Sequence, residues 1–177
     1  MIGSLSRRRF VTITAAAVGL GFAGGVGKAL AETAPVTWRG SLMGADASLR
    51  IHHPDASAAQ RLVERSIEEV RRLEGIFSLH RADSAVAQLN KRGFLVAPPP
   101  ELVEVLDASK RYHALTDGAF DPTVQPLWSL YRGHFSQIGA DPEGPSPSLV
   151  AGALNRVGFR HVSFDRNRVA FGRVGME

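Results

Sequence analysis

The chain has 177 residues, of which 44% are hydrophobic and 21% are charged, and it contains no cysteine. This length supports one globular domain with a hydrophobic core, and the composition excludes disorder throughout, collagen and coiled coils. The absence of cysteine excludes disulfides, zinc–thiolate centres and a cysteine nucleophile. The net charge of +4 is compatible with binding to a polyanion such as nucleic acid or to a membrane surface.

The excess positive charge lies entirely in the first 31 residues. They hold four basic and no acidic side chains, whereas residues 32–177 hold 17 of each. Residues 7–9 are arginines, an apolar run covers residues 11–26, and residues 29–31 read Ala-Leu-Ala. This order is typical of a signal peptide, and paired arginines before an apolar residue are typical of twin-arginine export. We therefore predict a twin-arginine signal and a periplasmic protein.

The alternatives for this segment are an ordinary secretory signal, an uncleaved anchor, or a basic arm that binds nucleic acid. In the mature chain, the basic residues are scattered and few aromatic residues lie between them, so we do not expect it to bind nucleic acid. The membrane is then relevant only to export of the precursor.

The next segment predicts strands followed by a long helix. Partial alternation of apolar residues over 38–52, broken at the Met-Gly pair 43–44, predicts a strand pair or one bent strand. Over 58–78, apolar residues recur every three or four positions, which predicts an amphipathic helix. Asp55 or Ser57 is the expected N-cap of that helix.

The second half of the mature chain predicts shorter elements. Capping residues, a triple proline and alternating apolar residues predict a short helix, a strand, a longer helix, a third helix and a hairpin. These expected elements cover, in order, residues 84–90, 93–97, 100–115, 148–157 and 162–171. Together they predict an α+β fold with a mixed sheet and packed helices. Because a chain that stops just after a hairpin leaves a sheet edge unpaired, we expect the sequence to be cut at its C-terminus.

Three loops carry residue types that bind ligands. The densest, TDGAFDPTVQPL at residues 116–127, combines two carboxylates and two hydroxyls with a glycine that permits close approach and prolines that stiffen the chain. Its alternative is a helix C-cap, with Gly118 in a left-handed conformation, followed by a turn in which Phe120 plugs the core. A polar loop at 78–84 is favoured as a capping loop. At residues 41–44, the glycine would admit a flat ligand, or the segment is a strand bulge.

In chain order, these loops resemble the FAD:protein FMN transferases, the ApbE-like family. The similarity rests on residues 38–44, on parts of 76–90, and above all on 116–127. It implies that residues 32–177 form the N-terminal, T-fold-like half of an ApbE-type fold. The family binds FAD in an elongated cleft, needs Mg2+, and transfers FMN to a Thr or Ser hydroxyl of an acceptor redox protein, releasing AMP.

The resemblance also implies which residues bind the cofactor. Met43 matches the family's FAD-contacting methionine, and His80 stands where many members carry an aromatic ring that stacks on flavin or adenine. Ala119, Phe120 and Asp121 match a segment that contacts FAD. The catalytic Gly-rich motif and the metal-binding Asp and Thr of the family would follow residue 177, so we expect neither catalytic nor metal-binding residues in this chain. The six histidines also lack metal-ligand spacing.

Three functions remain open at this point. The first is an exported flavin transferase or its N-terminal fragment, and a member without a lipid-anchor cysteine suits the maturation of nitrous-oxide reductase. The second is a non-catalytic periplasmic module that binds FAD or assists assembly. The third is a periplasmic α/β interaction domain.

Overall fold

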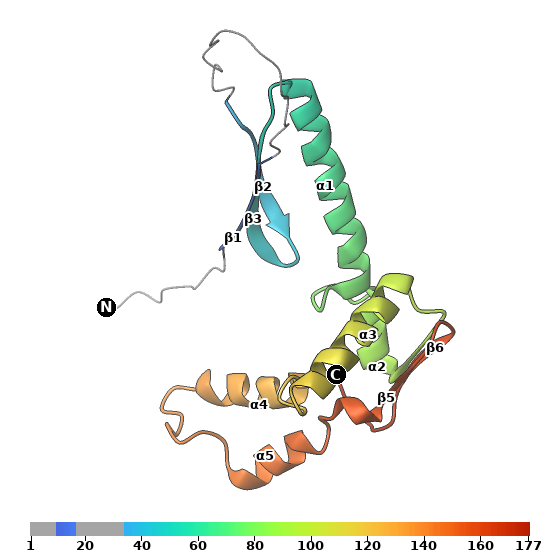
Figure 1. Cartoon of the computed structure of the whole chain (residues 1–177). Helices are drawn as coiled ribbons and strands as arrows, with labels where there is room; N and C mark the ends of the chain where they lie inside the picture. Colours follow the sequence, from blue (N-terminus) through green and yellow to red (C-terminus); the bar gives the residue numbers. More distant parts are fainter. Residues whose placement is uncertain (1–9, 17–33) are drawn as a thin grey trace. The chain divides into compact units, whose positions relative to one another are not determined.

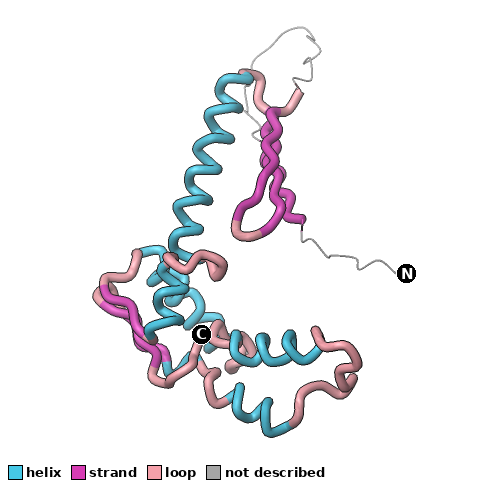
Figure 2. Tube along the Cα trace, turned by 180° about the vertical axis from the view of Figure 1, so that it is seen from behind, coloured by secondary structure: helices cyan, strands magenta, loops and turns pink. Residues whose placement is uncertain are grey.

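The structure is a computed structural model that describes residues 10–16 and 34–177. The chain divides into two compact units, Met1–His80 and Arg81–Glu177. Figure 1 labels their helices and strands, and Figure 2 distinguishes helix, strand and loop along the chain. The predicted α+β class is confirmed, with two small sheets. No helix in the described ranges is both long and apolar enough to cross a membrane.

The first unit contains a mixed three-stranded sheet in the order β1-β3-β2. β2 (Val36–Leu42) and β3 (Ala45–His52) pair antiparallel, which confirms the strand pair predicted over 38–52. β1 (Phe10–Ala16) pairs parallel with β3, so part of the apolar run assigned to the export signal is a strand here. The remainder of that segment, residues 1–9 and 17–33, lies outside the described residues, and export stays a prediction.

The hairpin between β2 and β3 reverses over only two residues. Leu42 pairs with Ala45, and Met43 and Gly44 between them have φ of 53° and 73°. Two positive φ values in a two-residue loop are the arrangement of a type I′ turn, whose twist matches that of the flanking strands. The strand bulge considered for this segment is therefore wrong.

α1 (Ala56–Phe77) follows the sheet and confirms the predicted long helix. Asp55 is its N-cap: its Oδ1 accepts hydrogen bonds from the backbone of Ser57 at 2.8 Å and Ala58 at 3.1 Å. The bond from Ala58, assisted by that from Ser57, lowers the pKa of the Asp55 carboxyl. The apolar face of α1 contacts β2 and β3, and its buried residues are Ala59, Val63, Ile67 and Ile76.

The second unit contains helices and an antiparallel sheet in the order β4-β6-β5. Its elements are α2 (Ala85–Arg92), β4 (Phe94–Val96), α3 (Pro100–Leu115), α4 (Gln125–Phe135), α5 (Pro147–Leu154), the 3-10 turn η1 (Phe159–His161), β5 (Val162–Phe164) and β6 (Arg168–Phe171). The five elements predicted for this half are all present. Its buried hydrophobic residues are Leu89, Leu102, Ala153, Phe159, Val169 and Met176.

Helix α4 was not expected from the sequence. Pro126 suggested a stiff loop, but it lies in the first turn of α4, where a missing N–H costs no hydrogen bond. α4 lies beside α5 (Figures 1 and 2). It carries three part-exposed aromatic residues at helical spacing, Trp128, Tyr131 and Phe135.

Candidate functional site

The densest predicted loop begins where α3 ends, and its own hydrogen bonds hold it. Thr116 Oγ1 donates to the carbonyl oxygen of Tyr112 at 2.8 Å and accepts from the backbone N–H of Phe120 at 2.9 Å. Asp117 and Gly118 have φ of 50° and 81°, so the chain reverses through the left-handed region. The left-handed conformation expected for Gly118 is confirmed.

Asp121 and Thr123 fasten the loop to η1. Asp121 Oδ1 accepts from Thr123 N at 2.9 Å and Thr123 Oγ1 at 2.6 Å, while its Oδ2 accepts from Phe159 N at 2.9 Å. Thr123 Oγ1 in turn accepts from Gly158 N at 2.8 Å. The Asp121 side chain is only 13% exposed. Its carboxylate is therefore engaged within the protein, and the segment before it can contact a ligand mainly through its backbone and Phe120.

That segment is open to solvent. Ala119 is exposed, and Phe120 is 43% exposed, with its ring edge-on to Tyr112 at a centroid distance of 6.2 Å. The alternative in which Phe120 plugs the core is therefore wrong. Ala119 and Phe120 are thus exposed, and Asp121, which is mostly buried, anchors the segment at one end.

His113 lies beneath this stretch, and sequence reasoning did not select it as a site residue. Its Nδ1 is 2.7 Å from the carbonyl oxygen of Phe120 and 3.8 Å from Asp121 Oδ2. The ring packs on Phe159 at a centroid distance of 5.7 Å, and the side chain is 27% exposed. The only feature of the sequence that pointed to His113 was its position: a polar residue on the apolar face of α3, shortly before the loop at residues 116–127.

A cavity of about 530 Å³ lies beside the loop. Its volume falls within the range of small-molecule sites, which is roughly 300–1,000 Å³. Its wall combines hydrogen-bonding and charged groups with apolar side chains: His113, Asp117, Asp121 and Arg160, together with Leu154 and Val157. Such a mixed wall suits a ring system that carries polar edges.

The other two predicted site residues lie in the first unit, at the β2–β3 turn. The Met43 backbone N–H donates to Glu74 Oε1, and the Met43 side chain is 44% exposed. The His80 ring lies against Gly44, where a Cβ would stand 2.4 Å from His80 Cδ2. The structure thus brings His80 to the turn that carries Met43. The His80 imidazole therefore occupies the space over Gly44 in which the sequence suggested that a flat ligand could bind.

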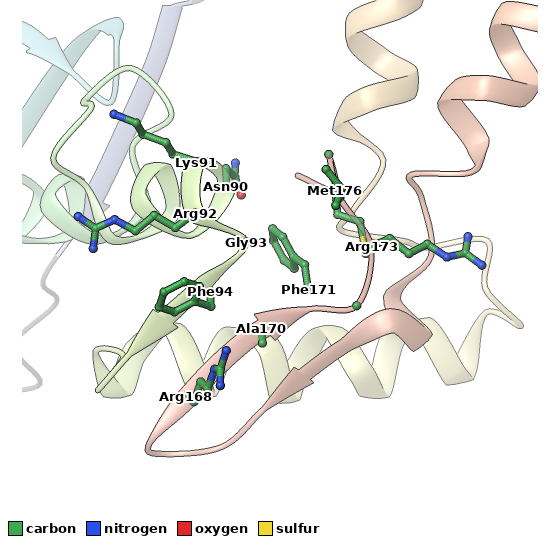
Figure 3. Close-up of a pocket in the computed structure, with 13 residues that line it drawn as sticks. Asn90, Lys91, Arg92, Gly93, Phe94, Arg168, Ala170, Phe171, Arg173 and Met176 are labelled. Carbon is green, nitrogen blue, oxygen red and sulfur yellow. The ribbon is translucent and has the colours of Figure 1, made fainter.

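A second cavity, of about 350 Å³, lies between the end of α2 and the strand β6 with its following segment. Figure 3 shows that Lys91, Arg92 and Arg173 point away from it. Arg173 donates to the carbonyl oxygen of Asn155 at 2.9 Å, and the Arg168 guanidinium lies 5.2 Å from the centre of the Phe94 ring. Despite its four basic residues, this cavity is not arranged to bind an anion.

Residues 10–16 and 34–177 contain no group of three or more His, Asp or Glu side chains placed to hold a metal ion. The described residues therefore do not form a Mg2+ site by themselves. The cavity beside the 116–123 loop does fit part of a flavin nucleotide, by its volume and its mixture of polar and apolar walls.

Comparison with known proteins places these features in one family. The model of the ApbE family matches residues 43–177. The fold is similar to the apo form of the flavinyl transferase ApbE from Pseudomonas stutzeri (TM-score 0.62, 24% identity) and to the ApbE protein of Thermotoga maritima (TM-score 0.64, 25% identity). Each comparison covers 81% of this chain and 46% of the other.

The flavin transferase ApbE from Vibrio cholerae is also similar, with a TM-score of 0.60 and 23% identity over 80% of this chain and 46% of that one. This chain thus spans about half the length of these structures. A search of curated proteins returned no match. Because the family model covers most of the sequence, including the β2–β3 turn and the 116–127 loop, the chain belongs to the ApbE family.

Proposed function

We propose that this chain supplies the flavin-binding part of an FAD:protein FMN transferase. The observation that carries the proposal is the anchoring of residues 119–121 by Asp121 and Thr123 beside a cavity of about 530 Å³. A binding surface that is held in place before the ligand arrives loses less conformational entropy on binding. The similar proteins from P. stutzeri and V. cholerae are described as flavin transferases, which supports flavin as the ligand.

In the proposed reaction, a Thr or Ser hydroxyl oxygen of the acceptor protein attacks the FMN-side phosphorus of FAD. A phosphorus–oxygen bond forms to the acceptor, the bridging bond to AMP breaks, AMP leaves, and the hydroxyl proton passes to solvent. Such transfers depend on positioning and on stabilisation of developing charge, which Mg2+ supplies when bound.

This chain's part is to bind and orient FAD. The ring of Phe120, which is 43% exposed, offers apolar contact. Met43 offers apolar contact, and His80 offers a ring on which flavin or adenine can stack. The proposal assigns to this chain the binding and orientation of FAD.

A second candidate is a non-catalytic module that binds FAD through the same anchored segment and cavity. The two candidates separate when the chain is incubated with FAD, Mg2+ and a flavin-acceptor domain, with a Thr→Ala version of the acceptor as control. Covalent FMN on the acceptor, detected by intact mass, supports the transferase. Retained, non-covalent FAD without transfer supports the module. If the chain neither transfers FMN nor retains FAD, both candidate functions are contradicted.

We further propose export by the twin-arginine pathway and an acceptor redox protein in the periplasm, with nitrous-oxide reductase maturation as the specific role. These proposals rest on the sequence of residues 1–31 and on the neutral charge balance beyond them. Deleting the gene should then leave the periplasmic acceptor of nitrous-oxide respiration without covalent FMN. Normal flavinylation in the deletion strain would contradict this role.

Replacing Arg7 and Arg8 together by lysine is predicted to block export. The twin-arginine receptor reads the arginine pair itself, so an unchanged charge should not rescue the signal. We expect full-length precursor to accumulate in the cytoplasm, measured by fractionation and immunoblotting. Arg9→Lys serves as the control and should leave export largely intact; normal processing of the double variant would exclude twin-arginine export.

A further inference from the structure

We propose that His113 is a binding and positioning residue of the flavin site. Its Nδ1–H fixes the backbone of residues 120–121, and its Nε2 accepts a hydrogen bond from an N–H group on the edge of the ligand's ring system. The second role rests on the proposed function, because FAD is the ligand considered. The first concerns the protein alone.

The hydrogen bond to Phe120 determines which nitrogen of His113 carries the proton. A carbonyl oxygen can only accept, so at 2.7 Å the Nδ1 atom must be the donor. In the neutral ring, the proton then sits on Nδ1 and the lone pair on Nε2. The Nε2 side of the ring faces Gly118, where a Cβ would lie 3.8 Å from it, and His113 lines the cavity beside the loop. We infer that this edge of the ring, with the Nε2 lone pair, is the part of His113 that a ligand in the cavity would meet.

The packing of His113 explains why it can fix the loop. The ring is held on one side by Phe159, whose own backbone N–H is bound by Asp121. Its Nδ1 reaches Phe120 from α3, seven residues earlier in the sequence. The helix, the exposed segment and η1 are thereby joined at a single imidazole. Without the Nδ1–H donor of His113, the Phe120 carbonyl would lose its hydrogen bond to α3.

The chemistry required of the ligand is a ring N–H or amino group that approaches edge-on. FAD offers two such groups, the imide N–H of the flavin and the amino group of adenine. Riboflavin and AMP, tested separately, distinguish them, because only the ligand that donates to Nε2 should lose affinity when Nε2 is removed.

Two variants separate the two nitrogens. His113→Asn places an amide N–H near the position of Nδ1 and lacks Nε2, whereas His113→Gln lacks the Nδ1 donor and reaches toward the position of Nε2. We expect the Gln variant to speed amide hydrogen exchange at Phe120 and Thr123 roughly 3- to 10-fold, the value of one hydrogen bond, and the Asn variant to leave it unchanged. We expect His113→Asn, which has no acceptor at the position of Nε2, to weaken FAD binding.

15N NMR of the chain without ligand, at neutral to alkaline pH, shows directly which ring nitrogen of His113 carries the proton. Under these conditions the proposal requires the Nδ1–H form. An Nε2–H form, or unchanged exchange in His113→Gln, would overturn the positioning role. Wild-type affinity for FAD in His113→Asn would overturn the acceptor role. If the wild-type chain binds no FAD, the proposed function and the acceptor role both fail, and the exchange data alone decide the positioning role.

Discussion

Replacing Asp121 by alanine is expected to lower the free energy of unfolding by about 3 kcal/mol and to abolish detectable FAD binding. The substitution removes the acceptor for three hydrogen bonds, two from Thr123 and one from the backbone of Phe159. Thr123 and Phe159 are both buried, so their donors would lose a partner that water cannot fully replace. Hydrogen bonds to a charged group are worth about 1.5–3 kcal/mol each, and they are not additive. Urea unfolding followed by circular dichroism measures the loss.

The matched control is Asp107→Ala. The Asp107 side chain is exposed on α3, so removing its carboxylate should change stability little. A double-mutant cycle with Thr123→Val then tests the coupling, because Asp121 and Thr123 act on the same contacts to residues 158–159. Equal stability losses for the Asp107 and Asp121 variants, or strict additivity in the cycle, would be incompatible with the contacts described.

Gly44→Ala is expected to cost about 2 kcal/mol of stability and to displace His80 from the β2–β3 turn. Gly44 has φ of +73°, and a Cβ there would stand 2.4 Å from His80 Cδ2. The left-handed conformation alone costs a non-glycine residue about 1–2 kcal/mol, and the imidazole must also move. FAD affinity should fall as well if His80 stacks on the ligand, as proposed. Thermal unfolding and FAD titration measure the two effects.

Gly75→Ala in α1 is the control for this substitution. No atom lies within 4 Å of a Cβ built at Gly75, and alanine is a better helix former than glycine, so stability should stay equal or rise by about 0.5–1 kcal/mol. Adding His80→Ala to Gly44→Ala should recover the steric part of the loss and leave the conformational part. A Gly44 variant as stable as the wild type would refute the described turn.

The elements that the sequence predicted are those fixed by local rules. Asp55 and Ser84 cap their helices through bonds to backbone N–H groups two or three residues ahead, which a sequence pattern can identify. The long helix followed from apolar spacing. α4 was missed because Pro126 reads as a helix breaker unless its place in the first turn is known.

The site was harder to predict because its decisive contacts are not local. The Asp121 carboxylate binds the backbone of a residue 38 positions later, and no pattern of residue types marks that pairing. His113 was missed for a related reason, since its role depends on how the loop folds back over the end of α3. The resemblance to the family identified residues 119–121. The structure shows that the Asp121 carboxylate in this segment is hydrogen-bonded to Thr123 and Phe159.

The most direct test of the central claim is a titration of the 15N-labelled chain with FAD, followed by amide chemical shifts. If the segment before Asp121 is a flavin-binding surface, the signals of residues 117–121 should shift in a saturable manner, together with the ring signals of His113. Shifts confined to residues 90–94, 168 and 170–176, which line the cavity in Figure 3, or no shifts at all, would contradict it.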